Sequence, residues 1–447
     1  MPIEPPSPSE RPRSARLHTV SIICERVVRL ISGILIGALV ARSLGPAEFG
    51  ELGFALQMLA LATPFAVLGL DASLVKWIVR EPEDRDRIVT QNLLTRVTMA
   101  SLVCAVAMLA VLAIGVGEQA QYVLIMLIGL IPQCTSTLDR FFLATRKGEL
   151  ILASSIAALL TAGSLRVYFA LYDPNVFFFA LTYLVEYFAQ GISLCIFYFL
   201  QRPRPNWSPG NLQTALSRLS ESIPLLPAAV AGAAFAAVGV IVLKIFSDDE
   251  QLGIFTAALR ITTAWVVVQA AIVAAAAPLI MEEATVERGA KGEVSLRLMR
   301  VIETATILSL VAAVGMAIVA PALEQILYGD QFQGVAILMT IHIWAALFAG
   351  WRKISGTWYV AEESLWLAFR RQLVGLLITA LFGIPLTIKY GAMGMAIGAL
   401  AGEIVAGWLV DFLGRKTRHH GMAKLRSFYP RVLIADLRKW RRSSGAV

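Results

Sequence analysis

The chain has 447 residues, of which 57% are hydrophobic and 16% are charged, and its mean hydropathy is +0.70. No single core of a soluble protein this long can bury so much apolar surface, so the composition excludes the soluble classes and indicates a polytopic membrane protein. The net charge of +8 reflects the basic loops described below and is weak evidence for nucleic-acid binding, so we expect no nucleic-acid partner.

Twelve segments are long and apolar enough to cross a bilayer, which takes about 20 residues of helix. We therefore predict an all-α fold with twelve transmembrane helices. Glu25, Arg26 and Arg29 interrupt the first apolar run, which favours a retained helix over a cleaved signal peptide. The predicted spans are residues 20–42, 52–71, 92–115, 120–138, 150–171, 175–200, 223–246, 252–281, 299–321, 333–351, 366–388 and 391–413.

Two echoes within the sequence indicate an internal duplication. The stretch ARSLGPAEFGELGFAL at 41–56 has a degenerate copy, EQLGIFTAALR, at 250–260. A second echo, at an offset of 217 residues, aligns Glu186 with Glu403. Because each half has six predicted helices, the repeat is parallel, and two six-helix lobes are expected to enclose a central cavity.

The linker between the halves, residues 201–222, begins with Pro and Arg and continues as a short helix that Ser208 or Asn211 can cap. The basic and apolar residues that alternate after Arg415 predict a tail lying on anionic lipid, or else a disordered basic tail. We predict three parts: an N-terminal six-helix lobe at 1–210, a C-terminal six-helix lobe at 211–413 and a basic cytoplasmic tail at 414–447.

The basic residues are sorted to one side of the predicted membrane. The termini and loops on that side carry 31 of the 39 Lys and Arg residues, whereas the opposite loops carry only Lys389. The positive-inside rule makes the first side cytoplasmic. Both termini are then expected in the cytoplasm, with the protein in the bacterial inner membrane.

Four stretches resemble the oligosaccharide flippases of the polysaccharide-biosynthesis family, within the multidrug/oligosaccharidyl-lipid/polysaccharide exporter superfamily. They are ARSLGPAEFG at 41–50, DDEQLGIFTAALR at 248–260, LYGDQF at 327–332 and the run ISGTWYVAEESLWLAFRRQLVGLL from Ile354. The resemblance implies movement of an isoprenoid-pyrophosphate-linked oligosaccharide from the cytoplasmic to the periplasmic leaflet, for O-antigen or exopolysaccharide synthesis. It also implies two lobes that open a central cavity alternately.

Three arginines lie deepest in the predicted helices: Arg29, Arg166 and Arg260. An arginine at the bilayer centre costs about 2.5 to 3.5 kcal/mol and usually faces a wet cavity or a charged partner. A pyrophosphate group needs forked cationic donors in such a cavity, which makes these residues substrate-binding candidates. The alternative is structural pairing, in which Glu25 neutralises Arg29 four residues later and Glu186 or Glu403 neutralises another arginine.

The sixth predicted helix carries a polar, aromatic face that includes Tyr183, Tyr187 and Gln190. Tyrosines beside amide groups suit sugar rings, although a polar seam between helices has the same pattern. Glu186 and Glu403 lie near mid-membrane, one in each half, and Glu25 is a third deep carboxyl group. These three glutamates are candidates for a proton or sodium site that couples transport, with structural pairing to arginine as the alternative.

The sequence contains no P-loop, zinc-ligand spacing or nucleophile elbow, so we expect no enzyme, cofactor or metal site. One alternative function is a multidrug or cation extruder of the same fold, which would favour an anionic cavity over one lined by arginine. A glycan polymerase or ligase would need larger outer loops than the sequence provides. The expected partners are membrane lipids, a lipid-linked oligosaccharide and polysaccharide polymerases or glycosyltransferases, and we expect a functional monomer.

Overall fold

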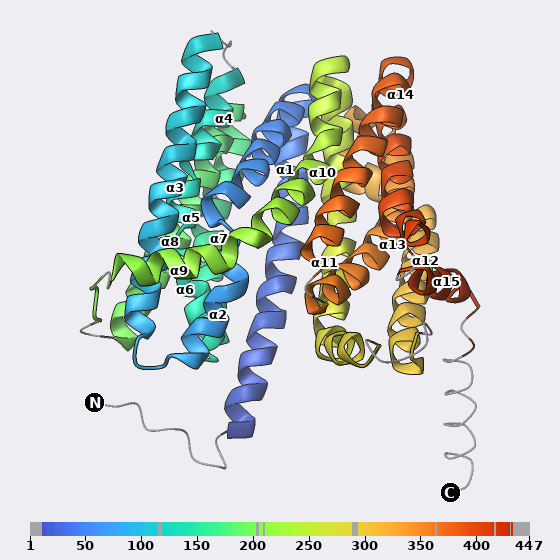
Figure 1. Cartoon of the computed structure of the whole chain (residues 1–447). Coiled ribbons are helices and arrows are strands. Elements are labelled where there is room, and N and C mark those ends of the chain that lie inside the picture. The colour runs from blue at the N-terminus through green and yellow to red at the C-terminus, as the bar shows by residue number, and fades with distance from the viewer. Residues whose placement is uncertain are drawn as a thin grey trace, which may run out of the picture. The chain divides into compact units, whose positions relative to one another are not determined.

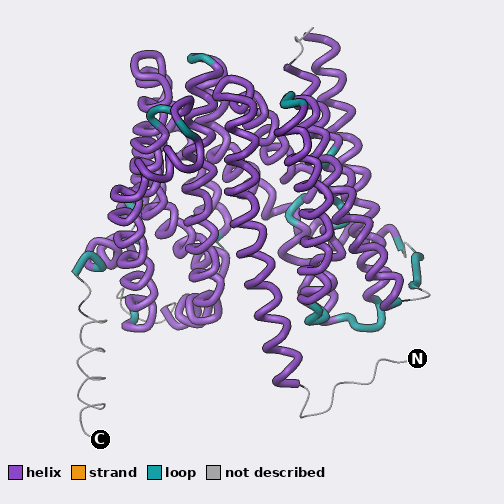
Figure 2. The backbone as a smooth tube through the Cα atoms, turned by 180° about the vertical axis from the view of Figure 1, so that it is seen from behind, coloured by secondary structure: helices purple, strands orange, loops and turns teal. Residues whose placement is uncertain are grey.

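The computed structural model describes residues 11–114, 119–202, 205–208, 211–287, 294–362, 364–414, 417–429 and 431. Within these ranges every regular element is a helix (Figure 2), which confirms the predicted all-α fold. Ten helical segments of the described chain are long and apolar enough to cross a membrane, so the protein is a multi-pass membrane protein.

Two of the ten segments, Leu17–Val67 and Leu365–Leu413, are 51 and 49 residues long and correspond to two predicted spans each. Each contains one residue with non-helical backbone angles, Gly45 with φ 76° and Gly391 with φ 57°. Glycine adopts a positive φ without a steric penalty, so these positions are suited to breaking a long helix. The number of membrane crossings, predicted as twelve, stays a prediction.

The chain divides into two compact units, Met1–Val230 and Ala231–Val447. The boundary predicted from the sequence is at 210, before the linker helix. In the structure this helix, α9 (Leu212–Ser222), lies across the long helices of the first unit and packs on α2 (Leu70–Arg80) (Figure 1). An ion pair of 2.8 Å between Lys76 and Glu221 joins the two helices. Asn211 caps α9 by accepting a hydrogen bond from the backbone N–H of Gln213.

The first unit contains the repeat motif at 41–56. α1 turns back at Gly45 (Figure 1), and Phe49 and Ala55, which follow the turn, are buried. The remaining helices of this unit are α3 (Arg85–Ile114), α4 (Gln119–Ile128), α5 (Leu130–Gln133), α6 (Ser136–Ala144), α7 (Gly148–Tyr172) and α8 (Val176–Gln201), and α1 covers Arg11–Val67. A core of large side chains, including Trp77, Phe141 and Phe142, joins α2 to α6.

The second unit contains the copy of the motif, in which Leu252 and Ala258 are buried like their counterparts in the first unit. Its long helices are α10 (Leu226–Phe246), which begins in the first unit, α11 (Asp249–Glu287), α12 (Leu296–Leu323), α13 (Val335–Ala361) and α14 (Leu365–Gly407). Short helical turns lie at η1 (Ile223–Leu225), η2 (Glu324–Tyr328), η3 (Asp330–Phe332) and η4 (Leu409–Leu413), and α15 (Arg418–Arg426) follows the last of them.

The two parts of α14 fold back on each other at Gly391 and pack through small residues. A Cβ atom added at Gly398 would lie 2.5 Å from the Cα of Gly383, and one added at Gly402 would lie 1.8 Å from Oγ1 of Thr379. The backbones therefore approach as closely as glycine permits. This contact pattern makes α14 the antiparallel helix pair that the spans 366–388 and 391–413 predict.

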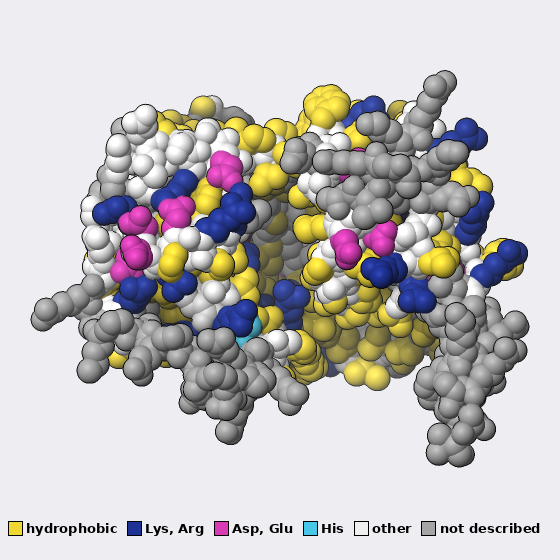
Figure 3. Space-filling view, turned by 60° about the horizontal axis from the view of Figure 1, so that its bottom comes forward, with side chains coloured by type: hydrophobic (Ala, Val, Ile, Leu, Met, Phe, Trp, Pro, Cys, Tyr) yellow, Lys and Arg dark blue, Asp and Glu magenta, His cyan; other side chains and the backbone are white. Residues whose placement is uncertain are grey.

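Charged side chains gather at one end of each unit. Figure 3 looks toward the lower end of Figure 1 and shows Lys, Arg, Asp and Glu side chains there, with hydrophobic side chains along the flank. This separation is the one expected for helices whose sides face lipid and whose ends face water. The predicted tail lies mostly outside the described residues, but α15 packs on η4 and α12 of the second unit.

Candidate functional site

Glu25 and Arg29 lie one turn apart on α1, form an ion pair with each other and share hydrogen bonds with α7, a helix that follows much later in the chain. Nε of Arg29 lies 2.8 Å from Oε1 of Glu25, and Nη2 donates to Oγ of Ser155 on α7 over 2.8 Å. Ser155 in turn donates to Glu25 over 3.1 Å. The predicted pairing of Glu25 with Arg29 is therefore present, yet 47% of the Arg29 side chain stays exposed.

Arg166, on α7, is held far more tightly. Its Nη2 lies 2.6 Å from Oε2 of Glu186, and its Nε donates to Oγ1 of Thr182 over 3.0 Å. The guanidinium also stacks over the ring of Tyr183, 3.9 Å from the ring centroid. With 6% of its side chain exposed, Arg166 satisfies the requirement that a buried arginine be paired and hydrogen-bonded.

Glu186 connects these two arginines. Its Oε1 lies 3.9 Å from Nη1 of Arg29, a charge contact beyond hydrogen-bond distance. We call Glu25, Arg29, Arg166 and Glu186 the first-unit cluster. Four of the residues that the sequence singled out thus meet where α1, α7 and α8 converge.

A second group of charges adjoins this cluster in the first unit. Asp71 of α2 lies 2.5 Å from buried Arg96 and 3.3 Å from Arg140. The two arginines, which belong to α3 and α6, pair with the Asp71 carboxylate from two different helices. Asp139 interacts electrostatically with Arg140 of this group and with Arg29 of the cluster. The first unit thus contains a continuous network of alternating charges.

The predicted sugar-facing residues of α8 have different neighbours, and their role towards a sugar stays a prediction. Tyr183 is covered by the Arg166 guanidinium. Tyr187 contacts Gly129 between α4 and α5, where an added Cβ would lie 2.9 Å from its ring, and it hydrogen-bonds to Gln133. Gln190 is half-buried further along the helix. Of the three, Tyr183 is the one joined to the cluster.

The carboxylate of Glu403 pairs with an arginine of its own unit, the second. Arg352 of α13 donates two parallel hydrogen bonds of 2.9 and 2.8 Å to this carboxylate, and a third, of 2.8 Å, to Gln372. This forked geometry is the strongest arrangement of an arginine and a carboxylate. The guanidinium also lies 5.1 Å from the ring centroid of Phe235.

Arg352 lies one residue beyond the predicted span 333–351, and so outside the predicted helix. The predicted helix ends at 351, but α13 continues to Ala361. The residues ISGTWYVA that follow are apolar enough to extend the helix, and this signal could have moved Arg352 into it.

Arg260 lies half-buried on α11 of the second unit and interacts electrostatically with Tyr328. Its role in binding the substrate stays a prediction.

The family model described as polysaccharide biosynthesis protein matches residues 18–283, more than half of the chain. No curated protein sequence matches.

Solved structures share the fold over nearly the whole chain. The lipid II flippase MurJ in an inward closed conformation matches with a TM-score of 0.68 at 12% identity, over 94% of this chain and 92% of MurJ. An inward-facing multidrug resistance MATE family transporter of the MOP superfamily matches with a TM-score of 0.66 at 15% identity, over 92% of this chain and 98% of that chain. At such identities the likeness shows the fold, and the family match carries the assignment: this chain belongs to the polysaccharide biosynthesis protein family.

Proposed function

We propose that this protein is a flippase that moves an isoprenoid-pyrophosphate-linked oligosaccharide from the cytoplasmic to the periplasmic leaflet of the bacterial inner membrane. Both termini lie in the cytoplasm, and the two lobes give access to the substrate alternately. The transported glycan serves cell-surface polysaccharide synthesis. Membership of the polysaccharide biosynthesis family supports this class of substrate, and the arginines of the first-unit cluster supply the chemistry that a pyrophosphate group needs.

The observation that carries the proposal is the difference between Arg29 and Arg166. Arg166 is buried and committed to Glu186, whereas nearly half of the Arg29 side chain is exposed and its contact with Glu186 is long, at 3.9 Å. Arg29 can therefore accept an anionic oxygen without dismantling the buried pair. We assign the substrate pyrophosphate to Arg29, with Arg166 holding Glu186 and Tyr183 in place behind it.

The same geometry suggests how an ion gradient is coupled to transport. When a pyrophosphate binds Arg29, the Glu25 carboxylate loses part of its interaction with its cation. A carboxylate without a cation binds a proton or a sodium ion more readily. Substrate binding and ion binding then favour each other at Arg29 and Glu25, and the Glu25 carboxylate returns to Arg29 when the substrate leaves.

The test measures flipping of a fluorescent polyprenyl-pyrophosphate-linked sugar in proteoliposomes by its accessibility from outside. Replacing Arg29 with Ala removes a charge-assisted contact of about 1.5 to 3 kcal/mol and is expected to lower substrate affinity about tenfold or more. Arg29→Lys should restore part of it, because the charge remains while the fork is lost. Arg26→Ala is the matched control, since Arg26 is an exposed arginine of the same helix that lies outside the cluster.

If Arg29→Ala folds and flips the lipid-linked sugar at the wild-type rate, the assignment of the pyrophosphate to Arg29 is wrong. A second candidate function, extrusion of drugs or cations, is favoured by the fold shared with a MATE multidrug transporter. It predicts transport of organic cations by the reconstituted protein and no flipping of the sugar substrate, so the same vesicles distinguish the two functions.

A further inference from the structure

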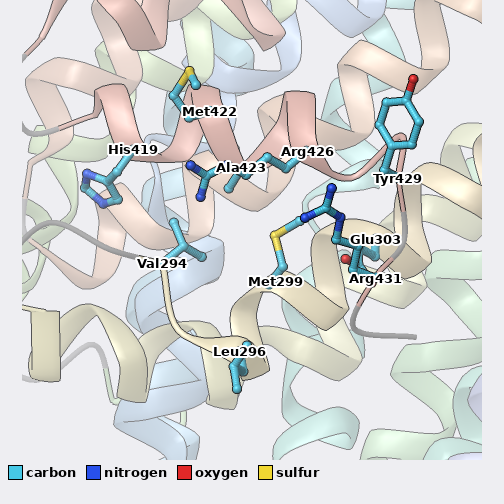
Figure 4. A pocket seen from close by; sticks show the side chains of 10 residues that line it. All are labelled: Val294, Leu296, Met299, Glu303, His419, Met422, Ala423, Arg426, Tyr429 and Arg431. Atoms are coloured by element: carbon cyan, nitrogen blue, oxygen red, sulfur yellow. The ribbon is translucent and has the colours of Figure 1, made fainter. Parts of the chain in front are cut away.

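A cavity of about 670 Å³ lies in the second unit between the start of α12 and α15 (Figure 4). Its lining combines basic, acidic, aromatic and apolar side chains. Arg426, Tyr429 and Arg431 line it from the α15 side, and Leu296, Met299 and Glu303 line it from α12. In Figure 4 the Arg431 side chain lies beside Met299 and Glu303.

The cavity lies where the membrane-spanning segments end. One span begins at Leu296, another ends at Leu413, and α15 follows directly after the latter. Glu303 is seven residues into α12, which corresponds to a depth of about 10 Å along a helix. The cavity therefore spans the layer in which phospholipid headgroups meet the first part of their acyl chains.

α15 presents an apolar face to the outside beside this cavity. Met422, which also lines the cavity, Leu425, and Phe428, which lies just beyond the end of α15, follow at intervals of three residues and are 39%, 44% and 41% exposed. Such a helix is suited to lying in the membrane interface with its apolar side chains in lipid. The membrane itself thus brings phospholipid to the mouth of the cavity, where Leu296 is 70% exposed.

The opposite face of α15 fixes the wall of the cavity. Nζ of Lys424, which is 1% exposed, donates to Asp411 over 2.6 Å, and to Ser355 and the carbonyl of Gly407 over 2.7 Å each. Ser427 shares a hydrogen bond of 2.8 Å with Thr306 of α12. Because these contacts hold α15 on both neighbours, the helix presents Arg426 from a fixed position, and Arg431 follows five residues after the end of the helix.

We propose that this cavity binds the headgroup of an anionic phospholipid. The guanidinium groups of Arg426 and Arg431 match the oxygens of a phosphate, and the Tyr429 phenol suits the polar side of the interface. The carboxylate of Glu303, a residue only 1% exposed, accepts a hydrogen bond from a headgroup hydroxyl. Leu296 and Met299 take the start of an acyl chain. Phosphatidylglycerol carries both a phosphate for the two arginines and a headgroup hydroxyl for Glu303, so it is the probe of choice.

The experiment uses the full chain in detergent and measures lipid binding by native mass spectrometry and by the lipid-dependent rise in melting temperature. The variant Arg426→Ala/Arg431→Ala is expected to bind phosphatidylglycerol about tenfold or more weakly, as expected for the loss of charge-assisted contacts. Arg418→Ala is the matched control, because Arg418 is an exposed arginine of α15 that does not line the cavity. Wild-type binding by the double variant overturns the proposal.

Two further arms identify the ligand. Soluble glycerol 3-phosphate carries the same phosphate and hydroxyl groups without acyl chains, and equal stabilisation by it would overturn the assignment to lipid. Phosphatidic acid carries the phosphate without a headgroup hydroxyl. Glu303→Gln should therefore lower the ratio of the affinity for phosphatidylglycerol to the affinity for phosphatidic acid. An unchanged ratio would show that Glu303 does not contact the headgroup hydroxyl. The melting temperature of each variant without lipid reports whether it folds.

Discussion

Two arginines of the same cluster differ in what their removal should do to stability. Arg166 is 6% exposed and paired with Glu186, whereas Arg29 is 47% exposed. Breaking a buried ion pair leaves an uncompensated charge and costs about 3 to 5 kcal/mol, while an exposed pair contributes about 1 kcal/mol or less. We expect Arg166→Ala to lower the free energy of unfolding far more than Arg29→Ala. Thermal denaturation in detergent checks this, and similar losses for both variants would contradict it.

The deep glutamates carry the prediction about coupling. Gln keeps the shape of the side chain and removes the titrating charge, so Glu25→Gln, Glu186→Gln or Glu403→Gln should abolish gradient-dependent flipping where the residue carries the ion, with substrate binding largely retained. The measurement compares initial flipping rates with and without a proton or sodium gradient. Unchanged gradient dependence in all three variants would leave these glutamates with a structural role.

At the scale of single elements, the α14 hairpin depends on the absence of a side chain at Gly402. A Cβ atom there would overlap Thr379, 1.8 Å from its Oγ1. Overpacking of this kind typically costs about 1 to 3 kcal/mol, so Gly402→Ala should lower the melting temperature. Gly315→Ala is the control, because a Cβ at Gly315 of α12 has no atom within 4 Å. If both variants melt alike, the close contact does not hold the hairpin together.

The attachment of α15 should depend on pH through His420. Burial, followed by the charges of His419, Lys424 and Arg371, holds the pKa of His420 well below its ordinary value of 6.5. The folded state therefore disfavours a proton that the unfolded state binds. The stabilisation is complete above about pH 6.5 and is lost as pH falls below it, by at most about 1.4 kcal/mol per pH unit.

The measurement for His420 is the melting temperature between pH 7 and pH 5. His420→Gln should flatten the dependence, and His419→Gln should keep most of it, since His419 is only half-buried. A steep dependence that survives in His420→Gln would assign the effect to another group.

The elements and their charges were predictable to different degrees. Apolar run length located the helices, because a bilayer dictates that length; Gly45 lies in a predicted gap between spans, and Gly391 is the first residue of the span that follows one. The pair Glu25–Arg29 followed from helical spacing alone. The bonds of Arg166 to Glu186 and of Arg352 to Glu403 depend on how different helices rotate against each other. Periodicity within one helix does not contain that information, and Arg352 also required knowing where α13 ends.

At the scale of the whole molecule, the sorting of basic residues remains the basis for orientation. The 31 to 1 distribution predicts that the last residues lie in the cytoplasm. A reporter enzyme that works only in the periplasm, fused after residue 447, should be inactive, and a cytoplasmic reporter at the same place should be active. The reverse result would invert the topology and with it the direction of transport that we propose.

The buried carboxylate of Asp411 has a consequence for biosynthesis. Asp411 is fully buried between Arg371 of α14 and Lys424 of α15, with Tyr359 of α13 beside it. When the ribosome has just added residue 411, Lys424 has not yet been synthesised. The nascent second unit then contains the Asp411 carboxylate with only one of its two cations, Arg371. Closure of this part of the unit has to wait until Lys424 leaves the ribosomal tunnel, and ribosomes that stall before this point would leave an incomplete product for membrane proteases to remove.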